Sequence, residues 1–277
     1  MNHDRFNGKS RTQFSTTLRY FLEANYSVTY TPTDRVFAEP LSQVAAFEFN
    51  DSVARVFDDM IERSVPGYRS IVLQTGMLAG KFSVPGTVCY DLGSSLGAAT
   101  LSMRHQIERH HRQDAAKIPI IALDNSEAML SRMRERIRNE DSPVPVSSEL
   151  ADISGYSYAK HSVAVLNFTL QFIPLQQRAP IIQSLADNMT SGGALILSEK
   201  IKFEDRQQQQ LMTSMYENFK RSNGYSELEI SQKRDALENV LIPETLSTHK
   251  KRLLDSGFTS VEVWFQCFNF ASLVAIR

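Results

Sequence analysis

Short apolar runs alternate with segments of helical periodicity through the middle of the chain. Runs rich in β-branched and aromatic residues at 87–92, 119–123, 162–168 and 194–198 predict strands, and a shorter run at 144–148 predicts an edge strand. Between these runs, apolar positions recur with the spacing of amphipathic helices. Strands that alternate with helices predict right-handed crossovers and a mostly parallel sheet covered on both faces. The pattern therefore indicates an α/β fold.

Two further helices are predicted before the first strand. Apolar positions with helical spacing begin after Asn50, Pro66 and Gly67 end this run, and a second apolar helix follows. Residues 1–45 have weak periodicity and many Ser, Thr and Asn residues, which predicts a poorly ordered N-terminal extension. We therefore expect one domain over residues 46–277.

The last third of the chain has a different pattern. From about residue 201 to 258, helix-capping signals are present and no strand pattern is evident, which predicts a helical insertion. Two apolar runs, 261–265 and 270–276, follow with a four-residue connection, so they must pair antiparallel. A mostly parallel sheet with a C-terminal antiparallel hairpin, a helical insertion before it and N-terminal helices indicates the Rossmann-like fold of S-adenosylmethionine-dependent methyltransferases.

Composition narrows the functional class. The formal net charge of -1 argues against the clustered excess of Lys and Arg that binds nucleic acid. The cysteines Cys89 and Cys267 give neither a disulfide framework nor a zinc-binding spacing. No apolar run reaches the ~18 to 20 residues of a membrane span, and the N-terminus lacks the apolar core of a secretion signal. These features predict a cytoplasmic protein that acts on small molecules, without direct contact to nucleic acid or membrane.

A loop with two glycines follows the first predicted strand. Residues 91–97, Asp-Leu-Gly-Ser-Ser-Leu-Gly, lie where open α/β sheets bind ligands, beyond the carboxyl end of a strand. Gly93 allows a tight turn, and the amides at the start of the next helix can face a polar ligand group. Ser95 stands where many nucleotide-binding loops have a second glycine, and its side chain crowds a pyrophosphate, which argues against a dinucleotide. A plain turn between strand and helix explains the motif about as well.

Polar residues also follow the other predicted strands. Asp124 and Asn125 end the second strand, where an acid can accept both ribose hydroxyls of a nucleoside; a helix N-cap is the alternative. Asp152 and Ile153 follow the third strand and can meet an adenine edge, although a surface turn is the simpler interpretation. Asn167 ends an otherwise apolar strand, and its buried amide needs partners from backbone or ligand.

The remaining polar residues give weaker signals. The histidines lack the carboxylate or cysteine spacing of a metal site, so no metal is predicted. A hydrolase is not indicated, because the chain lacks a Gly-x-Ser-x-Gly motif. In the insertion, the guanidinium of Arg234 suits bidentate binding of a carboxylate. From the residues alone, a surface pair between Arg234 and Glu238 is the favoured interpretation.

Longer strings of residues carry a more specific signal. From about Phe49 onward, the chain resembles the carboxy-S-adenosyl-L-methionine synthases, a family within the class I S-adenosylmethionine-dependent methyltransferase superfamily. The matching strings lie at residues 63–68, 94–100, 166–172, 223–234 and 264–270.

The resemblance implies an unusual reaction for this fold. In that family, prephenate is decarboxylated, the methyl group of S-adenosylmethionine is deprotonated to a sulfonium ylide, and the ylide captures the carbon dioxide. The products are carboxy-S-adenosylmethionine and phenylpyruvate, and the hydroxide expelled from prephenate is the base. A partner enzyme, a tRNA carboxymethyltransferase, then uses the product to modify the wobble uridine of tRNA (cmo5U34).

The resemblance also implies roles for particular residues. Arg234 is the implied catalytic residue and holds the new carboxylate of the bound product, carboxy-S-adenosylmethionine. A homodimer is implied as well. Ser94 stands where a known member of the family has cysteine, and the N-terminal extension matches no part of the family. The implied cofactor-binding residues are Tyr68, Gly93, Ser94, Ser95, Asp124, Asn125, Asp152, Ile153, Asn167 and Arg234.

Two other functions fit the same fold. One is a conventional S-adenosylmethionine-dependent methyltransferase that acts on a small molecule or tRNA, with Arg234 as a substrate-binding or surface charge. The other is a protein that binds S-adenosylmethionine without turnover. Turnover with prephenate distinguishes the synthase from both.

Overall fold

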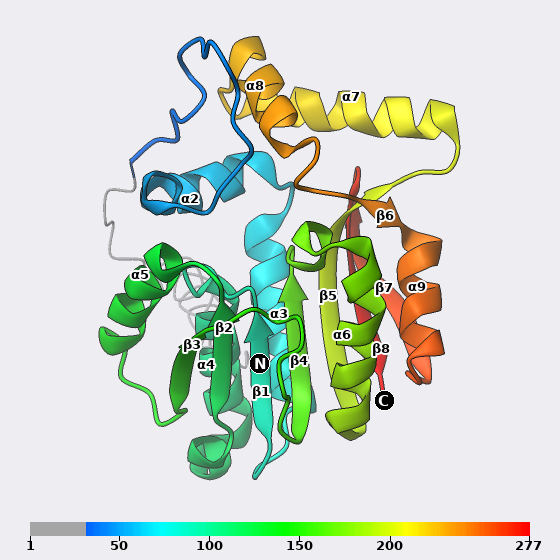
Figure 1. Ribbon diagram of the computed structural model, residues 1–277. Coiled ribbons are helices and arrows are strands. Elements are labelled where there is room, and N and C mark those ends of the chain that lie inside the picture. Colours follow the sequence, from blue (N-terminus) through cyan, green and yellow to red (C-terminus); the bar gives the residue numbers. More distant parts are fainter. Residues whose placement is uncertain (1–31) are drawn as a thin grey trace, which may run out of the picture. The chain divides into compact units, whose positions relative to one another are not determined.

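One mixed sheet organises the part of the chain that the computed structural model describes, residues 32–277 (Figure 1). Its strands lie in the order β3-β2-β1-β4-β5-β8-β7, and the short β6 pairs with β5 off this path. The strands are β1 (Val88–Leu92), β2 (Ile120–Asp124), β3 (Val146–Leu150), β4 (His161–Asn167), β5 (Met189–Lys202), β6 (Glu244–Thr245), β7 (Ser260–Cys267) and β8 (Phe270–Ile276).

The strand directions confirm the predicted fold class. Strands β1 to β5 pair parallel to their neighbours, whereas β8 is antiparallel to both β5 and β7. The result is a Rossmann-like sheet of the methyltransferase type, closed by a C-terminal antiparallel hairpin. The carboxyl ends of the parallel strands therefore meet at one edge, which is where open α/β sheets bind ligands.

Helices cover both faces of the sheet because its strands are apolar on both sides. Alternate residues of β1 show this: Cys89 packs with α3 and α4, while Tyr90 belongs to the core formed with α6 and α9. Helix α5 packs on Ala122 of β2, on the same face as α4. The helices are α3 (Tyr68–Phe82), α4 (Ala98–His111), α5 (Glu127–Arg138), α6 (Leu175–Asn188) and α9 (Leu246–Asp255).

Three helices lie beyond the carboxyl ends of the strands: α2 (Asp51–Ser64), α7 (Arg206–Ser222) and α8 (Glu227–Leu237) (Figure 1). The side chain of Asn50 caps α2 by accepting a hydrogen bond from the Val53 amide. Ser226 and Glu229 form the capping box that their spacing predicts at the start of α8. These caps fix the helix starts above the edge where the ligand-binding loops lie.

The segment predicted as one helical insertion, residues 201–258, has two parts. Helices α7 and α8 lie beyond the sheet edge, whereas α9 packs beside α6 on the sheet face, where Leu253 joins the core. Strand β5 also begins earlier than predicted, at Met189 rather than 194, because residues 189–193 continue the strand through an irregularity in its register with β4.

The predicted N-terminal extension lies partly outside the described residues, which begin at 32. Its described part contacts the insertion: the Leu41 amide donates a hydrogen bond to Gln232 Oε1 of α8 at 2.7 Å. A little further along, the Phe47 amide donates to the carbonyl of Ala236 at 3.0 Å. Among the described helices, none is both long and apolar enough to cross a membrane.

Candidate active site

The loop after β1 is shaped by two glycines in the left-handed backbone region. Gly93 has φ +75°, and a Cβ there would lie 2.4 Å from Thr169 Oγ1. Gly97 has φ +83°, and a Cβ would lie 2.5 Å from Met133 Cγ. Both conformation and space therefore require glycine at these positions. The left-handed conformation of Gly93 agrees with the tight turn predicted there, whereas the close neighbour of Gly97 is a side chain of α5.

Backbone hydrogen bonds join this loop to the end of β2. The amides of Gly93 and Ser94 donate to the carbonyl of Leu123 at 2.8 and 2.9 Å. The Ser95 amide donates to Asp124 Oδ2 at 2.8 Å, and the Ser126 amide donates to Asp124 Oδ1 at 2.8 Å. Burial raises the pKa of Asp124, and these amides oppose that effect. Asp124 thus fixes the loop, while the helix cap of α5 is the hydroxyl of Ser126.

Asp91 is a second carboxylate at the base of the loop. It is fully buried, and Thr100 Oγ1 donates to its Oδ2 at 2.5 Å. Burial raises its pKa to about 6, with a smaller contribution from the nearby charge of Asp124. Within the described part of the chain its Oδ1 has no hydrogen-bond partner. Asp91 therefore retains an acceptor at the cavity wall.

One cavity of about 330 Å³ lies between this edge of the sheet and helices α2, α7 and α8. Aromatic side chains from the segment before α2 and from α2 itself line it, and so do polar groups from the strand ends. It brings together nine of the ten predicted site residues: Tyr68, Gly93, Ser94, Ser95, Asp124, Asn125, Asp152, Ile153 and Asn167.

Two of these nine residues carry buried polar atoms that have no partner within residues 32–277, namely Ser94 Oγ and Asn167 Oδ1. Buried polar groups in proteins are nearly always hydrogen-bonded, so these atoms mark places where a ligand is expected to bind. Asp152, in contrast, uses Oδ1 to accept from the Ser154 amide at 2.8 Å. The turn predicted at Asp152 is thus present, and the residue also lines the cavity.

Arg234 does not line the cavity of this chain. Its side chain is 62% exposed, and its Nη1 lies 3.2 Å from Glu217 Oε1 of α7. A second carboxylate, that of its neighbour Asp235, lies 3.9 Å from its Nε. Within residues 32–277, Arg234 forms no ion pair with Glu238, its predicted surface partner, and pairs with Glu217 instead. The cation of α8 that does line the cavity is the preceding residue, Lys233.

Several lining residues were not predicted from the sequence. Lys200 and Tyr216 line the cavity from β5 and α7, and Phe47 and Phe57 line it from the N-terminal side. A signal for Lys200 exists, because a charged residue at the carboxyl end of an apolar strand resembles the positions of Asp124 and Asn167. The aromatic residues carry no comparable signal, since aromatic side chains in helices most often belong to an ordinary core.

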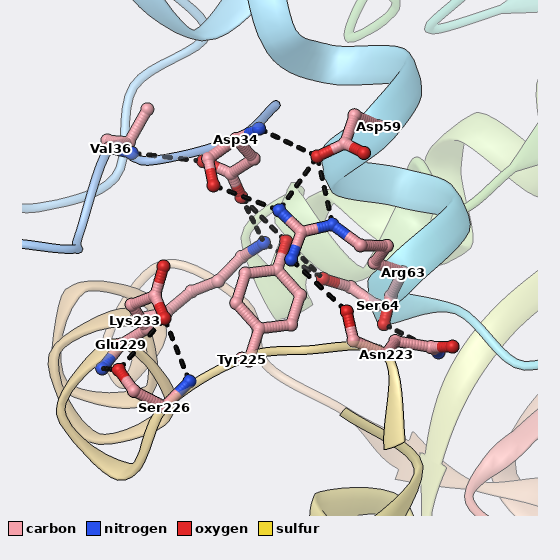
Figure 2. A network of polar contacts seen from close by, with 10 residues as sticks. All are labelled: Asp34, Val36, Asp59, Arg63, Ser64, Asn223, Tyr225, Ser226, Glu229 and Lys233. Carbon is pink, nitrogen blue, oxygen red and sulfur yellow. Dashed lines mark hydrogen bonds and ion pairs between the residues drawn. The ribbon is translucent and has the colours of Figure 1, made fainter. Parts of the chain in front are cut away.

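A buried polar network holds the insertion against α2 (Figure 2). Tyr225 donates its hydroxyl to Asp34 Oδ2 at 2.6 Å, and the Arg63 guanidinium binds Asp59 and the carbonyl of Asp34. Lys233 lies in the same network, with Nζ 3.0 Å from Ser64 Oγ and 3.8 Å from Asp34 Oδ2. The network therefore positions a lysine of α8 at the cavity wall.

Sheet order, hairpin and loop geometry together define the class: the chain has the fold of class I S-adenosylmethionine-dependent methyltransferases. Solved structures agree. Human N-acetylserotonin methyltransferase in complex with SAM gives a TM-score of 0.55 at 13% identity, covering 96% of this chain and 68% of that one. The magnesium protoporphyrin IX methyltransferase of Synechocystis PCC 6803 with bound SAH gives a TM-score of 0.53 at 15% identity, covering 79% of this chain and 86% of that one. At sequence identities of 13% and 15%, the structural similarity establishes the fold alone.

Closer relatives define the particular family. The carboxy-S-adenosyl-L-methionine synthase of Geobacter sp. (strain M21) is 53% identical over 246 residues, which are 88% of this chain and 98% of that protein. The synthase of Pseudomonas syringae pv. syringae (strain B728a) is 52% identical over 248 residues, with the same coverage. No protein-family model matches the chain. The chain belongs to the family of carboxy-S-adenosyl-L-methionine synthases, which are transferases.

Proposed function

We propose that this chain converts S-adenosylmethionine and prephenate into carboxy-S-adenosylmethionine and phenylpyruvate. The observation that carries the proposal is the identity of 53% to a synthase over nearly the whole of that relative. The cavity supports it because one wall offers polar strand ends and another offers aromatic side chains and lysines. S-adenosylmethionine is a substrate here, since the product contains it.

The proposed chemistry balances without an external base or oxidant. Prephenate loses carbon dioxide and hydroxide as its ring becomes aromatic, which leaves phenylpyruvate. The hydroxide removes a proton from the methyl group of S-adenosylmethionine and becomes water. The resulting carbanion of the sulfonium ylide forms a bond to carbon dioxide, which gives the carboxymethyl group. Production and capture of carbon dioxide in one cavity favour the reaction through proximity.

The residues that line the cavity suit S-adenosylmethionine. Asp124 retains free lone pairs beside its two amide contacts, so it can accept hydrogen bonds from ribose hydroxyls. Asp152 and Ile153 would bind the adenine, with Asn125 beside them. The unpartnered oxygens of Asp91 and Asn167 fit the amino group at the methionine end of the ligand. Tyr68, Gly93, Ser94 and Ser95 would complete the cofactor contacts.

Water must be kept from the methyl carbon, because an ylide is protonated by water. Helices α2, α7 and α8 lie over the strand ends, and the network of Figure 2 holds α8 and α2 together. Exclusion of water also strengthens the electrostatic interactions inside the cavity. In the proposed reaction, the insertion thus excludes water from the methyl carbon.

Arg234 remains the proposed catalytic residue for the new carboxylate. Because its guanidinium lies outside the cavity of the described chain, this role requires either movement of the side chain or delivery from a second copy. We propose a homodimer as the working form, with α7 and α8 as part of the contact. The product would pass to a tRNA carboxymethyltransferase, which places the enzyme in the cytoplasm with the tRNA.

Mass spectrometry of the small molecule released from the purified, denatured protein tests the proposal. Release of carboxy-S-adenosylmethionine, together with formation of phenylpyruvate from prephenate by the native enzyme, is the expected result. Release of S-adenosylmethionine alone, combined with no turnover of prephenate, would overturn the proposal. Transfer of the methyl group to an added acceptor would then identify a conventional methyltransferase.

A further inference from the structure

Two lysine ammonium groups lie over the ring of Tyr216, a residue of the cavity wall, and a third lysine lies close by. Lys200 Nζ lies 4.9 Å from the centre of the Tyr216 ring, and Lys220 Nζ lies 4.7 Å from it. The third lysine is Lys233 of α8, whose Nζ lies 5.4 Å from the centre of the Tyr225 ring and whose charge repels that of Lys220. Both Lys200 and Lys233 line the cavity. The lysines come from β5, α7 and α8, so the cluster forms only when the insertion packs over the sheet edge.

Nearby carboxylates balance the positive charge of this cluster only in part. Glu217 is the carboxylate near Lys200 and Lys220, but its Oε1 already accepts a hydrogen bond from Arg234 Nη1 at 3.2 Å. Asp34 lies 3.8 Å from Lys233 but already accepts the hydroxyl of Tyr225. Within residues 32–277, the ammonium groups of Lys200 and Lys220 have neither a hydrogen bond nor an ion pair to a carboxylate.

Two of the three lysines are also deeply buried. Lys220 is 5% exposed and Lys233 is 6% exposed. Burial first, and then repulsion from Lys233 and Lys200, lowers the pKa of Lys220 to about 7. Lys220, whose ammonium group has no hydrogen bond or ion pair within residues 32–277, is therefore an unfavourable buried cation. A bound anion would remove this unfavourable interaction. The cluster therefore has the properties of an anion-binding site.

The other side chains of the cavity wall indicate what the rest of such a ligand looks like. Phe57, Phe168 and Phe270 line the same cavity, and the Tyr216 ring packs edge-on against Phe270 with centroids 5.1 Å apart. Aromatic side chains favour a flat, apolar ring over an extended polar chain. The cavity therefore combines binding groups for carboxylates with space for a carbon ring.

We propose that Lys200 and Lys233 bind the carboxylate groups of the second substrate, a small dicarboxylate with an apolar ring, and that Lys220 adds to the positive potential. This inference rests on the proposed function, because prephenate has this chemistry. It assigns to these lysines the recognition of the substrate that supplies carbon dioxide. The polar residues at the carboxyl ends of the strands then bind S-adenosylmethionine.

The methionine end of S-adenosylmethionine also carries a carboxylate, so the test must separate the two sources. We would replace Lys200 and Lys233 singly by Met and measure the KM for prephenate by phenylpyruvate formation. The Kd for S-adenosylmethionine would be measured by calorimetry without prephenate. Lys202→Met is the matched control, since Lys202 is exposed on the same strand and does not line the cavity.

For both Met variants we expect the KM for prephenate to rise about tenfold or more, because a charge-assisted hydrogen bond is lost. The Kd for S-adenosylmethionine should stay within about twofold, and Lys202→Met should change neither value. Lys200→Arg keeps the charge and should recover part of the lost affinity. Thermal unfolding checks that each variant is folded. If Lys233→Met is not folded, the KM values of Lys200→Met and Lys200→Arg decide whether the lysines bind prephenate.

An unchanged KM for prephenate in Lys200→Met would overturn the inference. A loss of S-adenosylmethionine affinity without a change in that KM would overturn it too, and would assign the lysines to the methionine carboxylate. Failure of the proposed function is distinguishable, because the unmodified enzyme itself would then form no phenylpyruvate.

Discussion

Gly93→Ala tests whether the loop after β1 depends on a close approach as well as on backbone conformation. A left-handed conformation costs an L-residue about 1–2 kcal/mol. The new Cβ would also lie 2.4 Å from both Oγ1 and Cγ2 of Thr169. Thr169 Oγ1 donates to the carbonyl of Leu92 at 2.7 Å, so moving this side chain breaks a hydrogen bond worth about 1 kcal/mol. Overpacking adds about 1–3 kcal/mol.

Gly86→Ala is the matched control for this prediction. Gly86 has φ +85° with nothing within 4 Å of an added Cβ, so its variant bears the conformational cost alone. Urea denaturation of both variants should show a free energy of unfolding about 2–4 kcal/mol lower for Gly93→Ala than for Gly86→Ala. Equal losses, within about 0.5 kcal/mol, would show that Thr169 yields freely and that the close approach does not constrain the loop.

Other variants test the remaining groups. Asp124→Asn replaces one acceptor oxygen by an amide donor that faces a backbone N–H, so the Kd for S-adenosylmethionine should rise about tenfold or more by calorimetry; an unchanged Kd would remove Asp124 from the site. Arg234→Ala should weaken retention of the carboxylated product by roughly 2–5 kcal/mol if the pair is desolvated, and unchanged retention during gel filtration would exclude the proposed role. The pKa of Lys220 is about 7 in the fold and 10.5 in the unfolded chain, where it binds more protons, so stability should rise with pH from about 7 towards 10. The charged groups that face Lys220 are Lys200, Lys233, Arg234 and Glu217, and Lys220→Met should flatten this rise in urea denaturation at several pH values.

The strand-end part of the site could be predicted from the sequence because it follows from topology. Once strands 87–92 and 119–123 are parallel neighbours, the residues after them must meet at one edge, and Gly93 and Asp124 do so. The conformation of Gly93 could be inferred from a local turn signal. These inferences require no knowledge of how distant segments fold back.

The insertion side of the cavity could not be predicted in the same way. On a helix, consecutive residues point about 100° apart, so the choice between Lys233 and Arg234 depends on how α8 is rotated against α2. That rotation is fixed by Tyr225 and by Asp34, far away in the sequence. A local pattern of α8 does not contain this information, because α8 has polar residues on more than one side.

The contact between Asp34 and Tyr225 spans 191 positions of the chain. It couples the segment before α2 to the segment that leads into α8, although neither of these two segments is a strand of the sheet. A substitution of Asp34 removes the carboxylate that lies 3.8 Å from the buried ammonium group of Lys233, and so leaves this cation with fewer partners. We therefore expect that exchange of either segment with that of a relative preserves stability better when the other segment is exchanged with it.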